Sequence, residues 1–133
     1  ALARTLHAAT EGTDLKVAMA PYDVVIGPHI VQPDIVVAPR AAFTERDLHT
    51  TPLLVVEVRS PSTAWLDEGP KRSLYEEFGV AHYWLADPPE PSITILELVD
   101  GRYEPSQFAR DEEVLKISRP FESDMIPRKL TQG

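Results

Sequence analysis

The stretch that most constrains the fold is Leu53–Arg59, LLVVEVR, an apolar run that carries one glutamate before its final arginine. Because the run is apolar on both faces of a strand, it predicts a buried central strand. A helix predicted over Asp67–Phe78 follows, with Pro70 near its first turn and Gly79 just after its end. His82–Ala86 then predicts another strand. Strand, helix and strand in this order predict two parallel strands joined by a right-handed crossover.

Shorter elements are expected before this unit. A helix is predicted over Ala1–Thr10; no N-cap residue precedes it, so we expect that an N-terminal element is missing. Three strands follow, over Leu15–Met19, Tyr22–Ile26 and Ile30–Val37. The last contains a proline, which indicates an edge strand or a bulge. The mixed, polar stretch Ala41–Thr51 predicts a loop or a short helix begun by Thr44.

An antiparallel hairpin is predicted after the central unit. Ser92–Val99 and Arg102–Phe108 read as strands, and they flank Asp100-Gly101, a strong signal for a two-residue turn. Glu113–Ile117 predicts a last strand.

Composition narrows the class of protein. With 133 residues, of which 43% are hydrophobic and 26% charged, the chain is typical of one globular domain over residues 1–133. No apolar run approaches the ~18 residues of a membrane span, so we expect no membrane contact and a cytoplasmic location. The absence of cysteine excludes disulfides and thiol chemistry. A net charge of −8 provides no bulk attraction for nucleic acid.

Three charged residues stand where charge is costly. Asp34 lies within an apolar strand; taken alone it is best explained as an edge aspartate facing water, the alternative being a paired or metal-bound carboxylate. Glu57 lies deep in the central strand, either as a structural partner of Arg59 or as a functional carboxylate, which we favour. Lys71 lies on the apolar stripe of the predicted helix, where an isolated lysine usually extends its ammonium to water.

Together the three residues favour metal chemistry. Two carboxylates that converge across paired strands would supply hard oxygen ligands for Mg²⁺ or Mn²⁺. A neighbouring cation could then orient a metal-bound water and stabilise charge on a phosphoryl group. This is the chemistry of phosphodiester hydrolysis.

Several blocks occur in a characteristic order: Pro33-Asp34, VEVRSPST over Val56–Thr63, Lys71 with Tyr75, and GVAHYWLADP over Gly79–Pro88. This order resembles the Uma-two family of endonucleases, a bacterial branch of the PD-(D/E)XK, restriction-endonuclease-like superfamily. The resemblance covers roughly Val31–Gly101. It implies an α/β, restriction-endonuclease-like fold, that is, a mixed sheet with a central βαβ unit and a C-terminal antiparallel hairpin.

The resemblance also implies roles. Asp34 and Glu57 would be metal ligands for Mg²⁺ or Mn²⁺, with the backbone carbonyl of Val58 as a further ligand, and Lys71 would assist the attacking water. Arg59 stands where the superfamily usually places lysine; it is a poor base, although it can bind phosphate, and is a secondary candidate. The implied activity is that of a metal-dependent endonuclease hydrolysing phosphodiester bonds in DNA.

Other interpretations stay open. A catalytically inactive binding or assembly domain is favoured by Arg59 and by the expected missing N-terminal element, and hydrolysis of a small phosphodiester would suit the acidic charge. The superfamily often adds a glutamate on its first helix, but Glu11 lies past the helix end and is not assigned. The histidines share no metal-ligand spacing, and there is no glycine-rich phosphate loop. A homodimer would suit duplex cleavage, which needs two sites.

Overall fold

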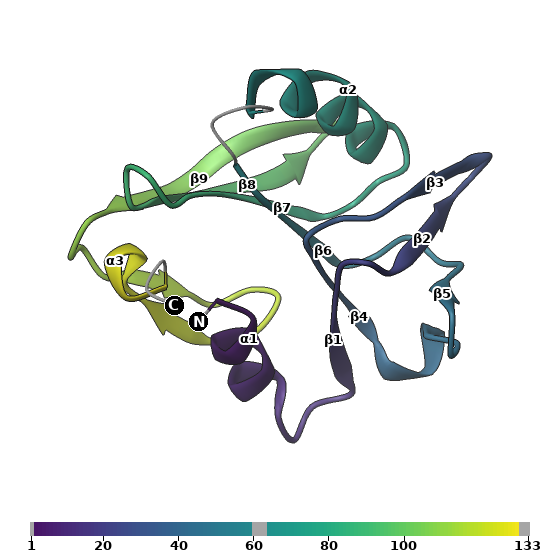
Figure 1. Cartoon of the computed structure of the whole chain (residues 1–133), viewed down its shortest axis with the longest axis horizontal. Helices are drawn as coiled ribbons and strands as arrows, with labels where there is room; N and C mark the ends of the chain where they lie inside the picture. The colour runs from purple at the N-terminus through teal and green to yellow at the C-terminus, as the bar shows by residue number, and fades with distance from the viewer. Residues whose placement is uncertain (1, 60–63, 131–133) are drawn as a thin grey trace.

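The structure is a computed structural model that describes residues 2–59 and 64–130, without the side chains of 64–68. A six-stranded sheet runs through its middle (Figure 1). In spatial order its strands are β1 (Leu15–Met19), β4 (Ile35–Pro39), β6 (Leu54–Val58), β7 (His82–Asp87), β8 (Ser92–Val99) and β9 (Arg102–Arg110). Within this six-stranded sheet β6 and β7 pair in parallel, and the other neighbouring strands are antiparallel. The predicted mixed sheet is confirmed.

The central βαβ unit is present as predicted. Strand β6 is paired on both sides, and its first three residues are fully buried because the sheet is covered on both faces. Helix α2 (Ala64–Glu77) connects it to β7 and is followed by Gly79, whose φ of 76° is one that glycine adopts readily at a helix end. The helix begins three residues before the predicted start, so Pro70 lies inside it rather than near its first turn.

Different elements cover the two faces of the sheet (Figure 1). One face, called here the α1 face, packs against α1 (Leu2–Thr10), the hairpin β10 (Leu115–Ile117) and β11 (Ser123–Met125), and α3 (Pro127–Leu130). The other face, called the α2 face, packs against α2 and a small sheet of β3 (His29–Val31), β2 (Asp23–Ile26) and β5 (Asp47–Leu48). No helix among the described residues is long and apolar enough to cross a membrane.

The two cores differ in chemistry. The core of the α1 face is almost entirely aliphatic around Trp84 and Phe121, whose ring centroids lie 6.0 Å apart. The core of the α2 face holds three tyrosines, with centroid distances of 5.3 Å between Tyr75 and Tyr83 and 5.4 Å between Tyr83 and Tyr103. The three tyrosine hydroxyls and the buried carboxylate of Glu57 thus belong to the α2 face, and this is the face on which the candidate site lies.

Two predictions for the N-terminal half are wrong. The single strand expected over Ile30–Val37 is two strands, β3 and β4, which lie in different sheets. Pro33 lies between them, and because proline has no backbone N–H to donate, it interrupts the strand. Strand β4 is not at an edge but lies between β1 and β6. For Ala41–Thr51, where a loop or a short helix was predicted, no helix begins at Thr44: after the 3₁₀ turn over Arg40–Ala42 the segment is a loop that includes the two-residue strand β5, so the loop alternative is the closer one.

The C-terminal hairpin is confirmed. Asp100 and Gly101 have φ values of 51° and 81°, as the mirror-image turn of a two-residue hairpin requires. The last strand predicted over Glu113–Ile117 is β10, which pairs with β11 rather than with the main sheet.

Candidate functional site

Glu57 is the charged residue most deeply placed in the sheet. Its neighbour Val56 belongs to the core of the α1 face, so alternation along β6 puts Glu57 on the α2 face. Only 9% of the residue is exposed. A carboxylate in this position is costly unless it has partners.

Helix α2 supplies those partners. The Tyr75 hydroxyl donates a hydrogen bond of 3.0 Å to Glu57 Oε1, and Lys71 Nζ lies 3.4 Å from Glu57 Oε2. Residues 71 and 75 are four apart, so they project from the same side of the helix, one turn apart. Each carboxylate oxygen thus has one partner from the same helix.

Asp34 reaches the same point from the neighbouring strand. It directly precedes β4, which pairs with β6 so that Ile35 lies opposite Val56. Its Oδ2 accepts a hydrogen bond of 2.6 Å from the backbone N–H of Val58. The structure therefore brings together Asp34, Glu57 and Lys71, the three residues that the sequence singled out.

The electrostatics of Glu57 reflect this setting. Its pKa is raised to about 7: burial is the largest cause, the charge of Asp34 adds to the rise, and Lys71 and the Tyr75 hydrogen bond oppose it. Burial, and then Glu57 itself, raise the pKa of the Tyr75 hydroxyl, so this hydroxyl remains a donor. The charge of Asp34 disfavours the ionised form of Glu57, and a divalent cation between the two carboxylates would relieve that repulsion.

The oxygen set suits a hard cation. In the part of the chain that the structure describes, no group of three or more His, Asp or Glu side chains could hold a metal. Two carboxylates beside a strand end suffice for Mg²⁺, which keeps several waters and takes few protein ligands. The two carboxylates of Asp34 and Glu57 are therefore donors of the kind that suits Mg²⁺ or Mn²⁺.

Two other residues lie apart from this cluster. Arg59 comes just after β6, and its Nη1 is 3.2 Å from Asp87 Oδ2 at the end of β7. Glu11 lines a pocket with Leu15 and Arg40, beside the end of β4 opposite to Asp34. Glu11 is thus remote from the carboxylate cluster, in keeping with its being left unassigned.

Tyr75 is the member of the cluster to which the sequence reasoning gave no role. It reads as part of the apolar stripe of the helix, and its ring is indeed core. Its hydroxyl is the exception, because it is turned toward Glu57. The available signal was its position four residues after Lys71 on the same stripe.

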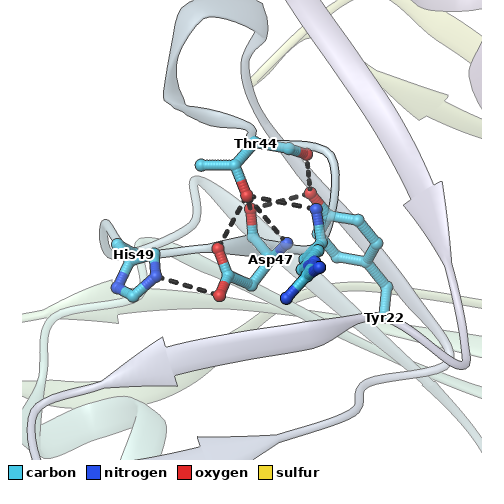
Figure 2. Close-up of polar contacts among 5 residues, drawn as sticks. Tyr22, Thr44, Asp47 and His49 are labelled. Atoms are coloured by element: carbon cyan, nitrogen blue, oxygen red, sulfur yellow. Dashed lines mark hydrogen bonds and ion pairs between the residues drawn. The ribbon is translucent and has the colours of Figure 1, made fainter.

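A second polar cluster, called here the loop cluster, lies around the start of β5 and the loop before it (Figure 2). Thr44 Oγ1 lies 2.7 Å from Asp47 Oδ1, and His49 Nε2 lies 3.0 Å from Asp47 Oδ2. The Tyr22 hydroxyl is 2.7 Å from the backbone carbonyls of both Thr44 and Asp47. The Asp47 N–H also donates to the Thr44 hydroxyl. These contacts brace the loop, and we assign them no chemistry.

Comparisons with known proteins identify the family of this chain and support its fold. The sequence model of the Uma2 family, described as "putative restriction endonuclease", matches residues 1–129. A solved structure of "a putative nuclease belonging to DUF820" from Anabaena variabilis superposes with a TM-score of 0.70. That likeness, at 14% sequence identity, covers 87% of this chain and 67% of the other, and it supports the fold. No curated protein matches the chain.

Proposed function

The chain belongs to the Uma2 family, and from that premise we propose that it is a metal-dependent nuclease that hydrolyses phosphodiester bonds in DNA. The observation that supports this most strongly is the convergence of Asp34, Glu57 and Lys71 at one end of the central strands. A buried carboxylate with a raised pKa, next to a second carboxylate and a cation, is typical of a functional site.

Asp34 and Glu57 are the proposed metal ligands, with the backbone carbonyl of Val58 as a third. Bound Mg²⁺ or Mn²⁺ supplies Lewis acidity toward the phosphoryl oxygen and makes a coordinated water more acidic. Because Asp34 is held by the N–H of Val58, the carboxylate is already positioned beside β6 before any ligand binds. This preorganisation avoids part of the entropic cost of assembling the site.

Lys71 is the proposed catalytic cation. Its ammonium is partly exposed and 3.4 Å from Glu57 Oε2, so it borders both the buried carboxylate and solvent. From there it would orient the attacking water and stabilise negative charge on the phosphoryl group. Tyr75 is a positioning residue: by donating to Oε1 it fixes the rotation of the Glu57 carboxylate. Arg59, paired with Asp87, is a secondary candidate for phosphate contact.

The proposal is tested by cleavage and by metal binding. Supercoiled plasmid and a single-stranded oligonucleotide are incubated with the purified chain, with Mn²⁺ and then with EDTA. Mn²⁺ affinity is measured by calorimetric titration. Asp34→Asn and Glu57→Gln preserve side-chain shape, and Asp47→Asn is a matched control because it changes a carboxylate of the loop cluster. Thermal melting of each variant reports folding.

We expect Mn²⁺-dependent cleavage by the unmodified chain and by Asp47→Asn, and loss of both cleavage and Mn²⁺ binding in the other two variants. Cleavage that persists in Glu57→Gln would contradict the assignment of the site. A folded, unmodified chain that neither binds Mn²⁺ nor cleaves would overturn the enzymatic proposal in favour of a non-catalytic nuclease-like domain.

A further inference from the structure

A row of side chains crosses the sheet away from Glu57. Glu57 is in register with Leu85, Leu85 with Thr94, and Thr94 with Phe108. Residues next to them in their strands, such as Ala86 and Ala109, belong to the core of the α1 face, so the row lies on the α2 face. Three strand spacings separate its ends, about 14 Å. Phe108 is therefore on the same face as the carboxylate cluster and within reach of one extended ligand.

Phe108 is a large aromatic side chain that is mostly exposed to solvent. It lies on the edge strand β9 and is 57% exposed, whereas Tyr103, earlier on the same strand, is buried under α2. None of the ring pairs formed by the side chains that the structure describes includes Phe108. An exposed aromatic ring on an edge strand is a flat apolar surface that a ligand ring can cover.

Phe108 also borders two pockets. One, of about 200 Å³, lies between Phe108 and the end of β7, and its lining includes Arg59, Leu85, Asp87, Glu90 and Thr94. The other, of about 360 Å³, is lined in part by Pro89, Pro91 and Arg110. The Phe108 ring thus lines both pockets.

The charged residues of the first pocket indicate which chemical group of a ligand could bind there. Asp87 and Glu90 supply carboxylates, and the guanidinium of Arg59 is paired with Asp87. Two carboxylates beside one paired guanidinium leave this pocket with a surplus of acceptors, and its carboxylate and hydroxyl oxygens accept hydrogen bonds from ring N–H and amino groups. A planar, neutral, nitrogen-rich ring is the ligand that satisfies both the aromatic wall and these acceptors.

We propose that Phe108 and the pocket beside it form a subsite for an unpaired nucleobase, which makes single-stranded or locally opened nucleic acid the substrate class. The inference rests on the proposed function, because it assumes that a nucleic-acid strand runs from the carboxylate cluster along the row. A base inside a duplex is covered by its neighbours and cannot present its face to Phe108. Stacking also offsets the weak phosphate attraction of a chain with a net charge of −8.

The test compares binding and cleavage in matched variants. Affinity for a labelled single-stranded oligonucleotide and for the corresponding duplex is measured by fluorescence anisotropy in EDTA, and kcat and KM are measured with Mn²⁺. The variants are Phe108→Ala, Phe108→Trp and, as a control, Ile30→Ala, which removes a side chain that is 66% exposed on β3. Calorimetry reports Mn²⁺ affinity.

Phe108→Ala should weaken single-strand binding by about 5- to 150-fold, the range that one stacked base contributes, and raise KM with little change in kcat or in Mn²⁺ affinity. Phe108→Trp should retain binding, Ile30→Ala should have no effect, and the duplex should bind more weakly. Equal binding by Phe108→Ala and the unmodified chain, or an equal loss in Ile30→Ala, overturns the inference. If cleavage persists in that case, the proposed function stands without the subsite.

Discussion

Two carboxylates of this protein, Glu57 and Asp47, have similar partners in different surroundings. Glu57 accepts a hydrogen bond from the Tyr75 hydroxyl and lies near Lys71. Asp47 lies within 3.0 Å of both the Thr44 hydroxyl and His49, and a tyrosine hydroxyl contacts its backbone carbonyl. A tally of polar contacts would not separate the two clusters.

Burial and the type of partner do separate them. The backbone N–H and carbonyl of Asp47 also form hydrogen bonds with Thr44 (Figure 2). The His49 side chain that contacts Asp47 is 60% exposed, so these contacts stabilise the conformation of the loop. The Glu57 carboxylate contacts side chains of α2 and is nearly covered, and its pKa is displaced. A carboxylate held at such a cost does not brace a loop, and we infer that it is retained for function.

The largest predicted effect is a loss of stability of the metal-free protein as the pH rises. The pKa of Glu57 is about 7 in the folded protein, against 4.5 for a free glutamate. The protonated side chain therefore contributes fully to the free energy of unfolding below pH 4.5, and this contribution is lost as the pH rises through 7 and the buried carboxyl ionises. The loss should reach about 3 kcal/mol by pH 8. Urea unfolding in EDTA at pH 4.5 and pH 8 measures it.

Glu57→Gln isolates this contribution, because glutamine is neutral at every pH. Relative to the unmodified chain, the variant should be about equally stable at pH 4.5 and about 3 kcal/mol more stable at pH 8. Glu104→Gln, on the exposed side of β9, should change stability by less than about 0.5 kcal/mol at either pH. An identical pH profile for all three proteins would show that Glu57 is not under electrostatic stress.

Removing the cation from the buried cluster should have the next largest effect. Lys71→Met keeps the aliphatic stem but loses the ammonium that opposes the raised pKa of Glu57. We expect Mn²⁺ binding to require a higher pH, since the carboxylate must be deprotonated to bind. Cleavage at pH 7 should fall by about 100-fold. Mn²⁺ titrations and cleavage assays across pH 6 to 9 measure both changes.

Lys16→Met is the matched control for that variant. Lys16 lies on β1 with its ammonium 5.3 Å from the centroid of the Phe43 ring, away from Glu57. It should leave the cleavage rate and Mn²⁺ binding unchanged. A comparable loss in both lysine variants would indicate a general effect of net charge rather than a role for Lys71.

The smallest effect is expected in the loop cluster. Thr44→Val removes the hydroxyl that contacts Asp47 and two backbone N–H groups, and should cost about 1 kcal/mol of stability. Mn²⁺ affinity and cleavage should not change. Chemical unfolding and calorimetry measure the two quantities, and a loss of Mn²⁺ binding would mean that the loop cluster belongs to the site after all.

Local patterns predicted much of this molecule. The apolar run of β6, the helix ended by Gly79 and the Asp100-Gly101 turn each depend on neighbouring residues, so they could be recognised along the chain. The site was predictable for a similar reason. A glutamate inside an apolar strand and a lysine on the apolar stripe of the next helix are both costly placements, and each marks a special position.

Other features depend on contacts between distant residues. Pro33 indicates an interruption of the strand, but the sequence does not show that β3 lies in a second sheet, because this depends on its pairing with β2. The role of the Tyr75 hydroxyl depends on which side of α2 faces Glu57.

The βαβ unit, the hairpin and the unusual positions of Glu57 and Lys71 could be derived from the sequence, because they follow from hydrophobic periodicity and turn chemistry. The contact of Asp34 with the backbone of Val58 and the alignment of Phe108 with Glu57 depend instead on how the strands pair in the folded protein. The reason is strand register: which residues lie opposite one another across a sheet depends on how all its strands pack at once.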